Sequence, residues 1–182
     1  RENGSQGIAF SPILLSGNRT SMPHGKPSEK KIEKGDFVIM DFGAKYNGYC
    51  SDMTRTVVMG QASEKQLKVY EIVQESQRVG LENVRAGVKG KEVRKKVTAV
   101  MNKYEFRDYA SKGLGHGIGL DNHEKPIMND LCEDILLENT LVTVEPGIYI
   151  PKWGGVRIED TVIVTDGPCQ VLMESPKELI SL

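Results

Sequence analysis

Two aspartates flank a stretch whose residues predict a β-hairpin, and their spacing could bring two carboxylates together. Asn47-Gly48 is a strong turn signal, because both residues tolerate the positive φ of a two-residue hairpin turn. Counting outward from this turn, Asp41 faces Thr54, and Asp52 points to the same side of the sheet. Two carboxylates roughly 7 Å apart at the backbone repel each other unless they are solvated, protonated or bridged by cations. The hairpin therefore indicates either a solvated face or a metal site.

Two glutamates form a second acidic set, and each lies among apolar residues typical of strands. Glu145 follows the run 141–144, and Glu159 lies in Arg157-Ile-Glu-Asp-Thr. A buried carboxylate costs several kcal/mol unless it is paired or binds a metal. Arg157 could neutralise one of the two glutamates in an ion pair, but it cannot easily account for both of them together with the aspartates.

A glycine-rich segment surrounds a histidine. In the segment 113–119, glycines at alternate positions let the backbone around His116 approach a neighbour closely. The spacing differs from that of a phosphate-binding loop, and no Lys-Ser or Lys-Thr pair follows. A lone histidine is more often structural than a ligand, but His123 lies in the same loop-rich segment, and His24 follows Met22-Pro23 in a predicted turn. A histidine ligand is the better interpretation.

One histidine and four carboxylates make a site of mostly oxygen donors. Such a donor set favours Mn, Co, Fe or Zn in a paired arrangement over a tetrahedral structural zinc site. Two metal ions about 3.5–4 Å apart can share a hydroxide and polarise a carbonyl. The predicted reaction class is therefore hydrolysis.

Strands and helices predicted from the hydrophobic pattern would position these residues. The predicted strands are Asp36–Met40, Thr54–Met59, Leu141–Val144, Gly147–Ile150 and Val156–Val164. A capping box at Ser63-Glu-Lys-Gln66 predicts a helix over residues 63–84. The second helix, over 91–104, carries a one-face apolar stripe made of Val93, Val97, Val100, Met101 and Tyr104. With a short closing helix near 176–180, the order of elements indicates an α+β domain.

Composition sets limits on partners and location. The 182 residues suit one domain, and the net charge of -1 gives no field that would gather nucleic acid or an anionic membrane. No apolar run approaches the roughly 20 residues that cross a bilayer. Three widely spaced cysteines fit neither a disulfide framework nor a zinc ribbon, so a reducing, cytoplasmic location is expected.

Taken in order, the chemical motifs resemble the five-ligand signature of the peptidases with the pita-bread fold, from about Ser16 to Leu179. The motifs are Asp41, Asp52, Gly-His116-Gly, Glu145-Pro-Gly and Arg-Ile-Glu159-Asp-Thr. Three longer strings resemble the branch of Xaa-Pro aminopeptidases and Xaa-Pro dipeptidases (prolidases) more than methionine aminopeptidases. These strings are Asp52-Met-Thr-Arg-Thr, His123-Glu-Lys-Pro and Gly155-Val-Arg-Ile-Glu-Asp-Thr.

The resemblance implies a mostly antiparallel sheet with flanking helices, arranged in two pseudo-symmetric halves. It implies five metal ligands: Asp41, Asp52, His116, Glu145 and Glu159. Asp52 and Glu159 would bridge two divalent ions, with Mn expected first and Co, Zn or Fe as alternatives. Glu145 would also move a proton from the bridging water to the leaving amine. His24 and His123 would hold the substrate carbonyl and the developing oxyanion.

The implied substrate is a peptide or dipeptide with proline at its second position. A relative without catalysis that serves as a binding module, or a truncated inactive fragment, is the alternative. Family domains usually begin with two further helices, and the Xaa-Pro enzymes carry a separate N-terminal domain that helps them to form oligomers, here a homodimer of the full-length protein. Residues 1–182 are therefore expected to be a metallopeptidase catalytic domain that lacks both of these parts.

Overall fold

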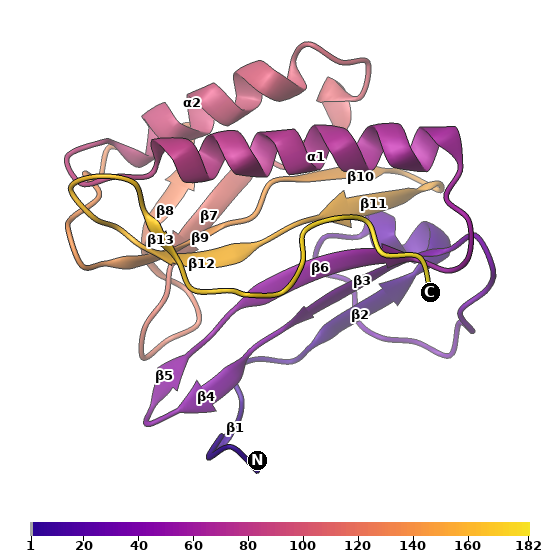
Figure 1. The fold of residues 1–182 in the computed structure, drawn as a ribbon, viewed down its shortest axis with the longest axis horizontal. Coiled ribbons are helices and arrows are strands. Elements are labelled where there is room, and N and C mark those ends of the chain that lie inside the picture. Colours follow the sequence, from indigo (N-terminus) through magenta and orange to yellow (C-terminus); the bar gives the residue numbers. More distant parts are fainter. Residues whose placement is uncertain (1) are drawn as a thin grey trace.

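The computed structural model describes residues 2–182 and has the predicted α+β architecture (Figure 1). Two helices, α1 (Glu64–Asn83) and α2 (Gly90–Met101), pack against each other and lie over one face of the sheets formed by the C-terminal part of the chain. Every ladder between the named strands is antiparallel. Neither helix has the length and apolar character that would be needed to cross a membrane.

The strands fall into two groups on either side of the helices in the sequence. The first group is β1 (Gly7–Ile8), β2 (Ile13–Ser16), β3 (Phe37–Phe42), β4 (Ala44–Tyr46), β5 (Tyr49–Cys50) and β6 (Met53–Val58). The second group is β7 (Gly113–Gly117), β8 (Glu124–Asn129), β9 (Leu141–Val144), β10 (Gly147–Ile150), β11 (Gly154–Arg157), β12 (Asp160–Ile163) and β13 (Gln170–Val171). Short 3-10 helices span Gly17–Ser21 (η1) and Arg107–Tyr109 (η2).

Two sheets carry the residues of interest. In the first group the strand order is β2-β3-β6, and in the second it is β13-β12-β9-β7-β8, with β10 and β11 forming a separate hairpin. An isolated bridge between Thr54 and Glu159 joins the two groups. The sheet β2-β3-β6 lies on the side of the molecule away from the helices (Figure 1).

The hairpin predicted around Asn47-Gly48 is confirmed. Tyr46 pairs with Tyr49, and both turn residues have positive φ, 47° for Asn47 and 85° for Gly48. The same register continues from β4–β5 into β3–β6, so that Asp41 pairs with Thr54 as counted from the turn. A turn of two residues thus determines which side chains of β3 and β6 share a face.

The helix predicted from residue 63 is confirmed as α1, and its capping box is present. The Ser63 hydroxyl accepts from the backbone N–H of Gln66 at 3.3 Å, and the Gln66 side chain accepts from the Ser63 N–H at 2.9 Å. These two bonds satisfy donors that no residue within the helix can reach.

Ser63→Ala is expected to lower the free energy of unfolding by about 1 kcal/mol, because it removes the acceptor for the Gln66 N–H. Urea denaturation followed by circular dichroism measures the change. Ser181→Ala is a matched control, since Ser181 is exposed and its side chain makes no hydrogen bond among residues 2–182. Equal midpoints for the two variants would contradict the capping role.

The hydrophobic core lies between the helices and the second group of strands. The stripe on α2 faces it as predicted, with Val93 and Val97 fully buried. On the opposite side of this interface, Val142 and Val144 of β9 belong to the same core. The prediction was wrong at the end of α2, which stops at Met101, so the partly buried Tyr104 packs from the following turn.

Two further predictions about the C-terminal region were wrong. The expected strand over 156–164 is divided into β11 and β12, and Glu159 lies in the link between them. The expected helix near 176–180 is absent from the described chain. Its backbone carbonyls instead accept from other elements: Pro176 O from Arg55 of β6, and Lys177 O from Tyr70 and Gln74 of α1. The segment is therefore held by side chains of both β6 and α1.

Candidate metal centre

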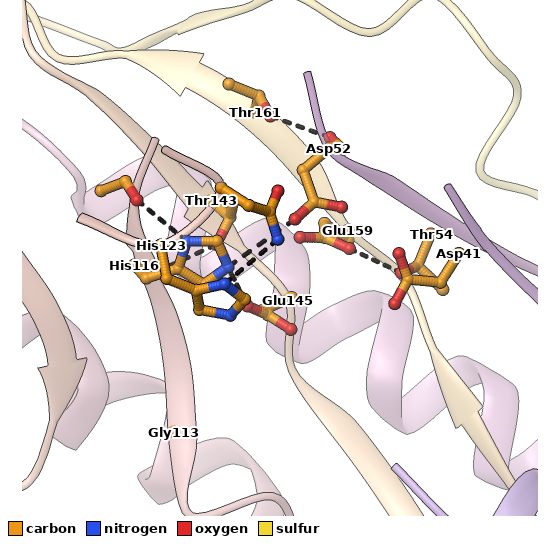
Figure 2. A network of polar contacts seen from close by, with 12 residues as sticks. Asp41, Asp52, Thr54, Gly113, His116, His123, Thr143, Glu145, Glu159 and Thr161 are labelled. Atoms are coloured by element: carbon orange, nitrogen blue, oxygen red, sulfur yellow. Dashed lines mark hydrogen bonds and ion pairs between the residues drawn. The ribbon is translucent and has the colours of Figure 1, made fainter. Parts of the chain in front are cut away.

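The first two predicted ligands lie on one face of the β3–β6 ladder. Asp41 is on β3, and Asp52 directly precedes β6, so the two side chains are diagonal neighbours. Both are buried, at 8% and 4% exposure. The Asp52 carbonyl accepts from the Thr161 hydroxyl at 2.8 Å, which ties this end of β6 to β12 (Figure 2).

His116 enters the same space from β7. Its Nδ1 lies 3.0 Å from the carbonyl of Gly117, so Nδ1 carries a proton and Nε2 can bind a cation when it is deprotonated. Nε2 lies 3.3 Å from Glu145 Oε1 and 3.7 Å from Asp52 Oδ2. The ring orientation is that of a histidine ligand whose second nitrogen is held by the backbone.

The glycines beside His116 let the backbone of β7 lie close to the neighbouring strands. A side chain at Gly115 would collide with the Thr143 carbonyl of β9, and one at Gly117 would collide with the Lys125 carbonyl of β8. The close approach that the glycine spacing predicted is therefore between backbones. It places the β7 histidine directly beside β9.

The two glutamates reach the site from β9 and from the β11–β12 link. Glu145 follows β9, and its Oε1 accepts from the Thr143 hydroxyl at 3.1 Å. Glu159 is 1% exposed, and its Oε2 accepts from the Thr54 hydroxyl at 2.5 Å. Figure 2 shows all five predicted ligands converging on one space.

Three of the four carboxylates keep an oxygen without any hydrogen-bond partner in the described chain. These buried atoms are Asp41 Oδ1, Asp52 Oδ1 and Glu159 Oε1. Burial and the charges of Asp41 and Glu145 raise the pKa of Asp52 to about 8. Burial likewise raises the pKa of Glu159 well above its usual value, and the other site carboxylates add to the rise. Without cations, the site thus disfavours its own ionised state.

The pKa values of Glu145 and His116 shift in opposite directions. Burial alone would raise the pKa of Glu145, but the hydrogen bond and charge of His116 lower it overall. Burial alone would lower the pKa of His116, but the Glu145 carboxylate raises it overall. Glu145 therefore favours its ionised form beside a histidine.

The residues present fit a divalent cation. Ligand atoms of Asp52, His116 and Glu159 all lie within 4.8 Å of one another. Oxygen atoms that lack donors, next to an imidazole nitrogen that is free to coordinate, are the groups that a divalent transition metal would satisfy. Whether each residue serves as a ligand stays a prediction.

A small cavity of about 70 Å³ brings all seven predicted site residues together. It is lined by Asp41, Asp52, His116, Glu145 and Glu159, together with His24 and His123. A larger pocket of about 740 Å³ is also lined by four of these residues, His24, His116, His123 and Glu145. The pocket therefore gives a substrate-sized space directly beside the candidate metal centre.

Two residues of the site went unrecognised in the sequence, and a third, Arg157, has a partner other than the one considered there. Arg157 does not pair with a glutamate, since it donates to Asp41 Oδ2 at 2.5 Å and to the Tyr149 hydroxyl at 2.8 Å. Thr54 and Thr143 orient the two glutamates. Thr54 carried a usable signal, because it lies two residues after Asp52 in a strand and so shares its face.

Comparisons with known proteins place the chain in a family. The profile of metallopeptidase family M24 matches residues 1–166. The Xaa-Pro dipeptidase of Pyrococcus furiosus is 46% identical over 178 residues, which cover 98% of this chain and 51% of that protein. The chain spans about half the length of the curated relatives it matches.

Solved structures agree in fold. A Xaa-Pro dipeptidase from Bacillus anthracis is 46% identical with a TM-score of 0.97, covering 100% of this chain and 51% of that one. An X-Pro aminopeptidase from Thermotoga maritima is 38% identical with a TM-score of 0.97, covering 100% and 52%. The expected pita-bread fold, of the Xaa-Pro dipeptidase and aminopeptidase type, is confirmed. The chain belongs to metallopeptidase family M24.

Proposed function

We propose that the protein is a metal-dependent peptidase that hydrolyses the peptide bond before a proline at the second position of its substrate. The observation that carries this proposal is a cluster of ligand atoms from Asp52, His116 and Glu159, which lie within 4.8 Å of one another. In the same site, three buried carboxylate oxygens, of Asp41, Asp52 and Glu159, have no hydrogen-bond partner among residues 2–182. The similarity to a Pyrococcus furiosus protein named Xaa-Pro dipeptidase supports the choice of substrate.

The proposed ligands are the five residues of the candidate metal centre: Asp41, Asp52, His116, Glu145 and Glu159. We place Asp52 and Glu159 as the bridging pair. Two divalent ions, with Mn as the first candidate and Co, Zn or Fe as alternatives, would supply a water of lowered pKa and would polarise the scissile carbonyl.

Glu145 is proposed to transfer the proton. Its side chain is 25% exposed and lines both the small cavity and the larger pocket, whereas Glu159 is buried. A glutamate is a carboxylate at neutral pH, so Glu145 can accept a proton from the attacking water and pass it to the leaving amine.

His123 and His24 are proposed to bind the substrate carbonyl and the developing oxyanion. The His123 ring stacks on His116 with centroids 3.8 Å apart. Its Nδ1 lies 3.1 Å from the side-chain amide of Asn122, and with the amide nitrogen as donor the His123 proton would reside on Nε2. Burial lowers the pKa of His123, which keeps the ring a neutral donor. Both histidines line the larger pocket.

The larger pocket is proposed to hold the substrate. Its wall includes Tyr109, Ile127 and Pro151, which offer apolar surface for a proline ring.

The proposed substrates are peptides or dipeptides, and the chain is proposed to be the catalytic part of a longer protein that forms a homodimer. All three cysteines are free, which supports a cytoplasmic location.

An inactive binding module is less well supported, because the chain keeps every expected ligand. In a module without catalysis, buried acidic oxygens that lack donors would only destabilise the fold. A methionine aminopeptidase is likewise less well supported by the relatives.

Metal content and turnover test the proposal together. After dialysis against Mn and then removal of free metal, elemental analysis is expected to give about two ions per chain. The protein is expected to release the first residue from a peptide that has proline second, and to leave an alanine-substituted peptide largely uncut. An absence of bound metal would overturn the proposal, as would equal cleavage of the two peptides.

A further inference from the structure

The Arg55 side chain on β6 is buried at 6% exposure, yet all five of its N–H donors have partners. Its Nε donates to Pro176 O at 2.9 Å, and one terminal nitrogen donates to Thr54 O at 2.9 Å and to Glu159 O at 2.6 Å. The other terminal nitrogen donates to Asp160 Oδ1 at 2.7 Å and to Ser175 O at 2.9 Å. The guanidinium is therefore fixed in one orientation.

Asp160 is fully buried and is held from several elements. Its Oδ1 accepts from Arg55, and its Oδ2 accepts from Gln77 of α1 and from Lys177 of the C-terminal segment, both at 2.7 Å. The Asp160 carboxylate thus connects β6, helix α1 and the start of β12. Every one of these contacts is charge-assisted, which makes it shorter and more directional than a neutral bond.

Both residues lie next to the proposed bridging ligands without reaching them. Arg55 is three residues after Asp52, and Asp160 directly follows Glu159. Neither side chain lines the small cavity. Arg55 donates a hydrogen bond to the carbonyl of Glu159, at the point where the isolated Thr54–Glu159 bridge joins the two groups of strands.

We propose that Arg55 and Asp160 form a positioning pair that sets the separation between the Asp52 and Glu159 carboxylates, and with it the affinity for the metal ion pair. The inference rests on the proposed function. A buried ion pair gives little net stability compared with apolar residues of similar size. The planar guanidinium of Arg55 instead makes hydrogen bonds in fixed directions, and these bonds fix the position of the Glu159 backbone relative to β6.

Arg55→Lys tests the pair. Lysine keeps the charge but has three donors in place of five, so it cannot hold the Glu159, Thr54 and Asp160 oxygens together with the C-terminal segment. The affinity for Mn, measured by isothermal titration calorimetry, is expected to fall about 10- to 100-fold, as for other residues that orient metal ligands. Two Mn ions in the unaltered protein are expected to give an exchange-coupled EPR spectrum, and the variant is expected to show uncoupled Mn.

Two additional variants separate positioning from general destabilisation. Val97→Ala opens the core between α2 and the sheet, away from the cavity, and is expected to lower the Tm without changing Mn affinity or the coupled spectrum. Asp160→Asn keeps the side-chain volume and is expected to weaken Mn binding in the same direction as Arg55→Lys. It carries the test if Arg55→Lys does not fold.

The outcomes distinguish this inference from the function on which it rests. If the unaltered protein binds no ion pair, the proposed function fails. If it binds two ions and the folded Arg55 and Asp160 variants bind them within twofold of the same affinity, with the same spectrum, the positioning pair is wrong. A loss of affinity in Val97→Ala equal to that in Arg55→Lys would also overturn it, because the effect would then follow stability alone.

Discussion

Asp52→Asn is expected to abolish binding of the metal ion pair and to reduce turnover of a proline-containing peptide by about 1,000-fold or more. A metal ion contributes several kcal/mol of transition-state stabilisation, and each 1.36 kcal/mol changes the rate tenfold. The substitution removes a charge that we place between both ions while keeping the side-chain volume. Elemental analysis and peptide release measured on the same sample check the result.

Misfolding would not explain such a loss. Because burial and neighbouring carboxylates raise the pKa of Asp52 to about 8, asparagine resembles the protonated side chain that the metal-free site prefers near neutral pH. The metal-free variant is therefore expected to melt no lower than the unaltered protein. Asp166→Asn, at an exposed position after β12, is the matched control and should keep full metal content. Two bound ions and normal turnover in Asp52→Asn would contradict the ligand assignment.

The affinity for metal is expected to rise at least about 100-fold between pH 6 and pH 8. A carboxylic acid must lose its proton before it binds a cation, and Asp52 stays protonated in the metal-free protein up to about pH 8. Each proton displaced makes the apparent affinity about tenfold tighter per pH unit below that pKa. The raised pKa values of Glu159 and His116 act in the same direction, so binding weakens as the pH falls.

Calorimetric titration of Mn at pH 6, 7 and 8 measures this dependence. Repeating each titration in two buffers that differ in ionisation heat counts the protons released, which should be at least one per chain at pH 6. Asp166→Asn should follow the same curve as the unaltered protein. An affinity that does not change with pH would show that the metal-free carboxylates are already ionised.

The sequence predicted which residues meet at the small cavity more fully than it predicted the contacts that hold them there. Counting from the two-residue turn gave the correct pairing of Asp41 with Thr54, because strand register follows from turn length. The capping box at Ser63 and the stripe on α2 likewise marked elements through local spacing. Each of these signals lies within a few residues along the chain.

The unpredicted features depend on contacts between distant residues. Arg157 pairs with Asp41, 116 positions earlier, and no local pattern distinguishes this partner from Glu145 or Glu159. The segment after Ser175 has residues compatible with a short helix, but its carbonyls are taken by Arg55, 121 positions away for Pro176. Tertiary hydrogen bonds therefore decided these local structures against their sequence pattern.

The isolated bridge between Thr54 and Glu159 has a consequence for motion. The proposed ligands come from both groups of strands, with Asp41 and Asp52 on one side and His116, Glu145 and Glu159 on the other. The ions bound by these residues would act as a cross-link between two sheets that otherwise meet through few backbone bonds. Metal loading would then couple the opening of the sheet β2-β3-β6 to that of the helical layer, so that the two unfold as one cooperative unit.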